Sequence, residues 1–254
     1  MKKISICLVV ILLSNIFSVF ANDTYAVRRD VNDKVINGLI NSGFYELVES
    51  HEGSYKLVDR NNEELNVSVQ EYVNGNKKYI FEESDKVDEV IFTSSGDIFL
   101  DGKQVIIKES NNNKLLYNDE ISLRAHRRYL TTHCPYGSDS DYYVLYDDTG
   151  NKSVFLQKAI ETITVGAFVS IMITALFANP IIGLCAGIFV MAYNTIKSRD
   201  PRTRSIGARD RSFTHYKGYN VGPGSVLRHV VDIYYDEECR YFVGTDRFYE
   251  VFEW

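Results

Sequence analysis

The chain has 254 residues, a formal net charge of −6, 45% hydrophobic residues and 24% charged residues. Its charge is unevenly spread: residues 22–150 carry 24 acidic and 14 basic side chains, whereas residues 151–254 carry 10 and 12. The acidic half has no basic stripe with which to neutralise phosphates, which excludes nucleic acid as a partner.

Residues 1–21 have the features of a secretory signal peptide. Lys2 and Lys3 precede an apolar run that reaches Phe20, and Ala21 is followed by polar residues. A basic start, a short apolar core and a small residue at the end are typical of such peptides. We therefore expect cleavage after Ala21 and a secreted protein. The alternative interpretation is an uncleaved N-terminal anchor.

Residues 22–48 are predicted to contain an amphipathic helix that ends at Gly43. Val27, Val31, Val35 and Leu39 follow the helical period, and the charged residues lie on the other face. An Asn, Asp or Thr between positions 22 and 24 can cap its start. We expect this helix to pack on the core of the domain.

Residues 49–158 are predicted to form an acidic antiparallel β domain. Apolar residues alternate in several runs, and Asn74-Gly75 and Asp101-Gly102 are hairpin signals between them. Such alternation is typical of a sheet with one buried face.

Residues 159–197 carry the most distinctive pattern, because residues 162–196 contain no charged side chain. Pro180 breaks this run near its middle, which predicts a hydrophobic hairpin of two helices of about 17 residues each. Small residues recur along both arms and would let the two backbones approach closely. We assign membrane insertion to the recurring small residues and to the Asn179-Pro180 break between the two arms. The small residues are Gly166, Ser170, Thr174, Ala178, Gly183 and Gly187. The alternative is a buried hairpin that never meets lipid.

Residues 198–211 are predicted to be a basic linker. The basic side chains in and just before it are Lys197, Arg199, Arg202, Arg204, Arg209 and Arg211. After signal-peptide cleavage and two spans, this segment would lie outside the cell, against the positive-inside tendency. Export as a soluble protein removes the conflict, and the six basic residues could then contact anionic head groups of a target membrane. The alternative is a solvated, flexible linker.

Residues 212–254 are predicted to form aromatic-rich strands. Cys134 and Cys239 could form a disulfide in an exported protein, closing a loop of about 100 residues worth roughly 4–5 kcal/mol. His215 and His229 have no acidic or cysteine partner at ligand spacing, and no metal set or catalytic motif is present. The sequence therefore predicts a protein that is not an enzyme, with no metal and no cofactor.

Together these segments predict an α+β fold in which antiparallel β-rich domains flank a central hydrophobic α-helical hairpin. This organisation, with the apolar run 162–196 and the aromatic tail 234–254, resembles the geobacillin-type large secreted bacteriocins. The hairpin is also similar in plan to that of pore-forming colicins, although the surrounding strands depart from their all-helical domain.

The resemblance implies a secreted antibacterial protein that acts on target membranes by inserting its helices. The partners would be the lipid membrane of the target cell and an immunity protein. The alternative is a membrane-anchored cell-surface protein with a binding or structural role. A secreted enzyme has no motif to support it.

Overall fold

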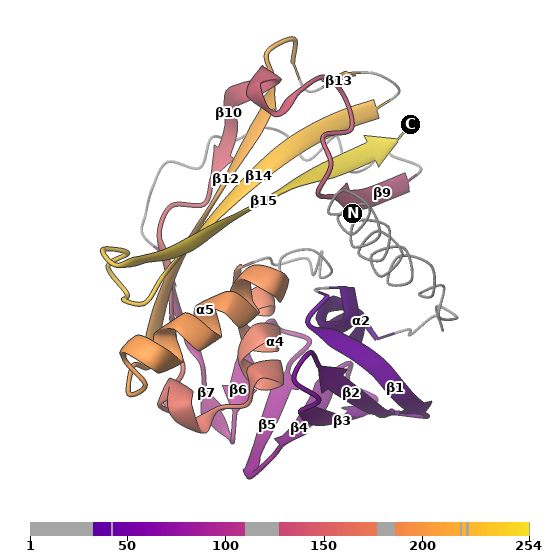
Figure 1. Ribbon diagram of the computed structural model, residues 1–254, viewed down its shortest axis with the longest axis vertical. Helices are drawn as coiled ribbons and strands as arrows, with labels where there is room; N and C mark the ends of the chain where they lie inside the picture. Colours follow the sequence, from indigo (N-terminus) through magenta and orange to yellow (C-terminus); the bar gives the residue numbers. More distant parts are fainter. Residues whose placement is uncertain are drawn as a thin grey trace, which may run out of the picture. The chain divides into compact units, whose positions relative to one another are not determined.

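The computed structural model describes residues 33–41, 43–109, 127–176, 186–218, 220–221 and 224–253. Of these residues, 50% are in β-strands and 21% are helical. Two antiparallel sheets, called sheet A and sheet B below, lie on either side of helices α4 (Val165–Leu176) and α5 (Ala186–Arg199) (Figure 1).

Sheet A is a seven-stranded meander in which each strand pairs with the next one along the chain. Gly75 and Gly102 make two of its turns with φ values of 81° and 72°, which glycine adopts without strain. These are the hairpin turns that the sequence predicts. The strands are β1 (Tyr45–His51), β2 (Ser54–Asp59), β3 (Glu64–Glu71), β4 (Lys77–Glu83), β5 (Lys86–Phe92), β6 (Ile98–Leu100) and β7 (Lys103–Gln104).

Sheet B has eight strands, drawn from both sides of the apolar segment. The order is β8-β11-β12-β14-β15-β9, with β10 paired to β12 and β13 paired to β14. Because β12, β14 and β15 are long neighbours, they form the centre of this sheet. The strands are β8 (Ile106–Glu109), β9 (Arg127–Thr131), β10 (Tyr142–Asp148), β11 (Lys152–Phe155), β12 (Ser205–His215), β13 (Asn220–Val221), β14 (Gly224–Tyr234) and β15 (Phe242–Glu253).

Helix α2 (Lys34–Asn41) is the described part of the predicted N-terminal helix. Asp33 caps it, because its Oδ1 accepts hydrogen bonds from the backbone N of Val35 (2.9 Å) and of Ile36 (3.2 Å). Its Oδ2 accepts a third from the hydroxyl of Tyr79 on β4, at 2.8 Å. Asp33 therefore both starts the helix and ties it to sheet A. The predicted caps at positions 22–24 lie outside the described residues.

Helices α4 and α5 pack on each other, and of the two sheets α4 contacts mainly sheet A whereas α5 contacts sheet B. A Cβ at Gly166 would lie 2.6 Å from a ring carbon of Phe81, and one at Gly244 would lie 2.4 Å from the terminal carbon of Met191. Both glycines therefore allow a helix and a sheet to approach closely. Between the two helices, the rings of Phe168 and Tyr193 lie 5.5 Å apart.

The predicted fold of two β-rich domains around a central helical hairpin is wrong. The described residues are mostly β, with three α-helices. Strands β8 to β11, which precede the apolar segment, share sheet B with β12, β14 and β15, which follow it. The described parts of α4 and α5 span 12 and 14 residues, and of the two sheets α4 contacts mainly sheet A whereas α5 contacts sheet B. The predicted break at Asn179-Pro180 lies outside the described residues.

Candidate functional site

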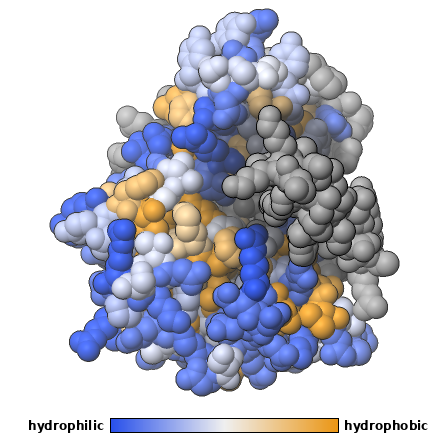
Figure 2. Space-filling view, viewed as in Figure 1, coloured by the Kyte–Doolittle hydropathy of each residue, from blue (hydrophilic) through white to orange (hydrophobic). Residues whose placement is uncertain are grey.

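Helix α4 is enclosed by the rest of the protein. It carries no charged side chain, and ten of its 12 residues are buried. Its neighbours are α2, α5 and strands of both sheets. On the face shown in Figure 2, hydrophilic residues cover most of sheet A, whereas hydrophobic residues gather at the level of the helices. An uncharged helix covered in this way would bury its apolar surface equally well in lipid.

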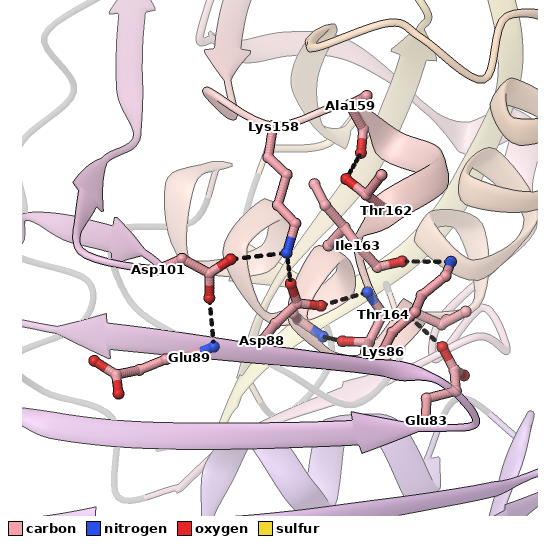
Figure 3. Close-up of polar contacts among 12 residues, drawn as sticks. Glu83, Lys86, Asp88, Glu89, Asp101, Lys158, Ala159, Thr162, Ile163 and Thr164 are labelled. Carbon is pink, nitrogen blue, oxygen red and sulfur yellow. Dashed lines mark hydrogen bonds and ion pairs between the residues drawn. The ribbon is translucent and has the colours of Figure 1, made fainter.

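A polar cluster holds the N-terminal end of α4 on sheet A. We call it the α4 anchor, and it consists of Glu83, Lys86, Asp88, Asp101 and Lys158 (Figure 3). Each of these residues hydrogen-bonds either a group at the start of α4, a charged partner or an adjoining strand.

Asp88 on β5 is the centre of the anchor and is completely buried. Its Oδ1 accepts a hydrogen bond from Nζ of Lys158, and its Oδ2 accepts one from the backbone N of Thr164, both at 2.5 Å. Thr164 in turn caps α4, because its Oγ1 accepts a hydrogen bond from the backbone N of Ala167 at 3.2 Å. A negative charge next to these amides also suits the positive end of the helix dipole.

Lys158 bridges two carboxylates, because its Nζ also lies 2.7 Å from Oδ2 of Asp101. Burial by itself lowers the pKa of Lys158, but the carboxylates of Asp101 and Asp88 outweigh it and hold the pKa above its ordinary value. Lys158 is therefore charged at neutral pH. Its charge compensates that of buried Asp88, which would otherwise be costly to enclose.

Glu83 on β4 is the second carboxylate that binds α4. Its Oε2 accepts a hydrogen bond from the backbone N of Val165 at 3.0 Å, and its Oε1 accepts one from the hydroxyl of Tyr45 at 3.4 Å. Burial raises the pKa of Glu83 above its ordinary value. The first turn of α4 is thus held by two carboxylates from adjacent strands.

Lys86 connects the residue just before α4 to the neighbouring helix α5. Its Nζ donates to the backbone O of Ile163 and to the hydroxyl of Tyr193 on α5, both at 3.2 Å. The Tyr193 hydroxyl donates to the same carbonyl at 2.6 Å. Burial and the nearby charge of Lys197 lower the pKa of Lys86. This contact joins α4, α5 and sheet A at one point.

The sequence analysis missed the α4 anchor, although a signal for it exists. In β4 and β5, Glu83 and Asp88 stand at the same alternating positions as buried Phe81 and Val90. A carboxylate at an inward position of a strand must find a partner. That pattern can be read from the sequence, but its partner Lys158 lies 70 residues away.

The predicted insertion residues are only partly described. Gly166 contacts sheet A, through Phe81 and Leu65, rather than α5. Ser170 and Thr174 donate to backbone oxygens of α4 itself, those of Ala167 and Ser170. Gly187 lies in the first turn of α5. The remaining four, which lie outside the described residues, are Ala178, Asn179, Pro180 and Gly183.

The six predicted head-group contacts divide into two kinds. Arg209 and Arg211 lie on β12, where Arg209 binds Asp148 and Nη2 of Arg211 lies 2.5 Å from Oδ2 of Asp232. These two arginines therefore form ion pairs between strands of sheet B. The exposed ones follow the end of α5 or lie in its last turn, and they are Lys197, Arg199, Arg202 and Arg204.

The predicted disulfide is absent, because Cys134 and Cys239 are both free thiols. Cys134 lies beside the small cluster of Tyr142, Val226 and neighbouring side chains. The Sγ of Cys239 lies 2.5 Å from the position of a Cβ at Gly207. Each cysteine is thus accommodated by a different part of sheet B.

His229 has acidic partners after all. Its Nδ1 lies 3.0 Å from Oδ2 of Asp210, and its Nε2 lies 3.4 Å from Oε2 of Glu250. Burial lowers the pKa of His229, but the two carboxylates outweigh it and raise the pKa to about 9. The partners come from neighbouring strands β12 and β15, so spacing along the chain could not reveal them.

Three further findings bear on function. Comparison of the chain with protein-family models, with curated proteins and with solved structures finds no match. In the part of the chain that the structure describes, no helix has the length and apolar character needed to cross a membrane. Among the same residues, no group of three or more His, Cys, Asp or Glu side chains is placed to hold a metal ion.

Proposed function

We propose that the protein is a secreted antibacterial protein that acts on the membranes of target cells, and that residues 162–196 are the part that enters the lipid. The observation that carries this proposal is the enclosure of α4, an uncharged helix, between sheet A, α2 and α5. A helix with no polar face can be buried either by protein or by lipid.

The polar contacts of α4 with sheet A are gathered at its first turn, which supports its release. The α4 anchor consists of hydrogen bonds and ion pairs, and the rest of the helix is in apolar contact. Apolar contacts with protein can be exchanged for apolar contacts with lipid at little change in free energy. Loss of the anchor would therefore remove the main polar barrier to release.

Exposed basic residues at the end of α5 supply an attraction to the membrane surface. Lys197, Arg199, Arg202 and Arg204 are exposed. Near an anionic membrane each basic residue contributes about 1 kcal/mol of attraction. The proposal therefore places the end of α5 against the head groups before the helices leave the sheets.

The described parts of the two helices are short. At 1.5 Å per residue they are about 18 and 21 Å long, whereas the hydrocarbon core is about 30 Å thick. In this proposal these described parts lie in the outer part of the bilayer. A permanent surface anchor is less well supported, since α4 is already covered by protein.

Dye release from vesicles tests this function. We expect the purified protein to release dye from vesicles rich in anionic lipid and to release much less from zwitterionic ones. Lys158→Met should increase the rate, because it removes the cation that compensates Asp88. Lys152→Met is the matched control, since Lys152 pairs with Glu109 in sheet B at 2.8 Å. No release from anionic vesicles at any dose would refute the proposal.

A further inference from the structure

Three tyrosine side chains are exposed at one end of sheet B, and we call them the tyrosine patch. They are Tyr136 in the loop before β10, Tyr143 at the start of β10, and Tyr216, which directly follows β12. Their exposed fractions are 42%, 66% and 48%. The rings of Tyr143 and Tyr216 lie 6.3 Å apart, and their planes differ by only 5°. Aromatic surface gathered in one exposed place is typical of a binding site.

The buried side chain of His215 holds the tyrosine patch in place. Its ring stacks on that of Tyr216 with 4.5 Å between the centroids, and it makes an edge contact with the ring of Tyr136 at 5.7 Å. The backbone N of Lys217 donates a hydrogen bond to Nδ1 of His215 at 3.1 Å, and the carbonyl of Tyr136 accepts one from the hydroxyl of Tyr142 at 3.0 Å. The patch is therefore preorganised, so a ligand loses little free energy in ordering it.

The available hydrogen-bonding groups of the tyrosine patch are uncharged. In the described part of the chain, the hydroxyls of its three tyrosines make no hydrogen bond. The charged groups beside them are already engaged: Asp139 pairs with Arg228 at 3.9 Å, and Asp141 accepts hydrogen bonds from the backbone N and the hydroxyl of Ser138. The ammonium group of Lys217 lies over a ring of the patch, 5.4 Å from its centroid. A ligand that matches this surface is therefore neutral and combines an apolar face with hydroxyl groups.

A second copy of the chain is the competing occupant, because Val144 and Leu145, which follow on β10, are also exposed. The pairing of β10 with β12 shifts register twice, between Tyr142 and Val144 and again between Leu145 and Asp147. Such bulges bend a strand and protect its edge against another strand. They disfavour edge-to-edge pairing of β10 between two copies.

We propose that the tyrosine patch binds a neutral glycan, a chain of pyranose sugar rings. A pyranose ring has a face of C–H groups and a rim of hydroxyls, and a tyrosine side chain offers the matching apolar ring and polar tip. Tyr143, the most exposed of the three, would stack on one sugar ring, and the other two tyrosines would contact the neighbouring units. Glycan binding needs no membrane, so this inference does not depend on the proposed function.

Calorimetric titration of the full-length protein tests the site. The probes are cellohexaose, chitohexaose and maltoheptaose, which are neutral chains of sugar rings that differ in linkage and substituents. We expect at least one of them to bind with a Kd below about 1 mM, and we expect no binding of sorbitol, a polyol that has the hydroxyls but no sugar ring. The absence of any heat of binding for all three chains up to about 10 mM would overturn the proposal. So would equal binding of sorbitol.

Two variants locate the binding. Tyr143→Ala with Tyr216→Ala should weaken glycan binding at least about tenfold, because the ring contacts are lost. Tyr241→Ala is the matched control, since Tyr241 is 50% exposed and stacks on the ring of Tyr235 at 4.9 Å, but at the turn between β14 and β15. All three positions are exposed, so both variants should fold. Unchanged glycan affinity in the double variant overturns the proposal, and so does a dimer of the unmodified protein that the same variant converts to a monomer.

Discussion

The carboxylate of Asp88 lies 2.5 Å from the ammonium group of Lys158, although 70 residues separate them in the chain. Asp88 is completely buried, and its other oxygen holds the residue that caps α4. One ion pair therefore joins sheet A, the segment before α4 and the start of that helix. Removal of this ion pair should affect the packing of both α4 and α5.

Lys158→Met should lower the free energy of unfolding by about 3 kcal/mol, because it leaves a buried carboxylate without its counter-charge. Lys152→Met should lower it by about 1 kcal/mol or less, because its partner Glu109 is largely exposed. Urea denaturation followed by circular dichroism measures both. Equal losses of unfolding free energy in the two variants would show that the α4 anchor stabilises the protein no more than an exposed ion pair does.

Gly166→Ala should destabilise the protein by about 1–3 kcal/mol, even though alanine favours helix. The new Cβ would lie 2.6 Å from a ring carbon of Phe81 and 2.9 Å from a methyl carbon of Leu65. Adding Phe81→Leu should recover part of this loss, because the two positions are in contact. Strictly additive free energies in the double variant would contradict the close packing of α4 on sheet A.

The stability of the protein should fall between about pH 7 and pH 10 because of His229. Its folded-state pKa of about 9 lies above the ordinary value of 6.5, so its stabilising charge is fully present below pH 6.5 and is lost as the pH rises through 9. The loss should be roughly 2–3 kcal/mol. His229→Gln should be less stable at pH 7, and its difference from the unmodified protein should shrink by pH 10. A difference that stays constant with pH would contradict a charged His229.

Arg202→Gln with Arg204→Gln should weaken binding to anionic vesicles by about 2 kcal/mol, or about thirtyfold, without changing stability. Both side chains are exposed. Arg209→Gln should instead lower stability, because it breaks the pair with Asp148 inside sheet B. Vesicle flotation and urea denaturation together separate the two effects. Stronger loss of vesicle binding in Arg209→Gln than in the double variant would reverse this assignment.

Local patterns predict much of the secondary structure. The alternation in β4 and β5 and the turns at Gly75 and Gly102 depend on neighbouring residues, and they are present as predicted. The uncharged run also contains helices. Such features are set by steric and solvation preferences over a few residues, so a single sequence carries them.

The arrangement of these elements could not be predicted in the same way. Nothing near Lys152 indicates that β11 pairs with Ser205–Ala208 of β12, whose paired residues lie 50 to 56 positions later, and with β8 on its other side. The pairing of Arg209 with Asp148 has the same origin, so the sequence analysis did not predict it. The global packing of the chain decides which strands pair, and the short-range periodicity of the sequence does not encode that choice.

The most direct test of the account is the position of α4 when the protein meets a membrane. An environment-sensitive fluorophore would be attached at Thr174→Cys, a partly buried position in α4, in a protein whose other cysteines are replaced by serine. We predict that anionic vesicles carrying spin-labelled acyl chains quench this fluorophore and that zwitterionic vesicles do not. Unquenched emission from protein bound to the anionic vesicles would contradict the claim that α4 enters lipid.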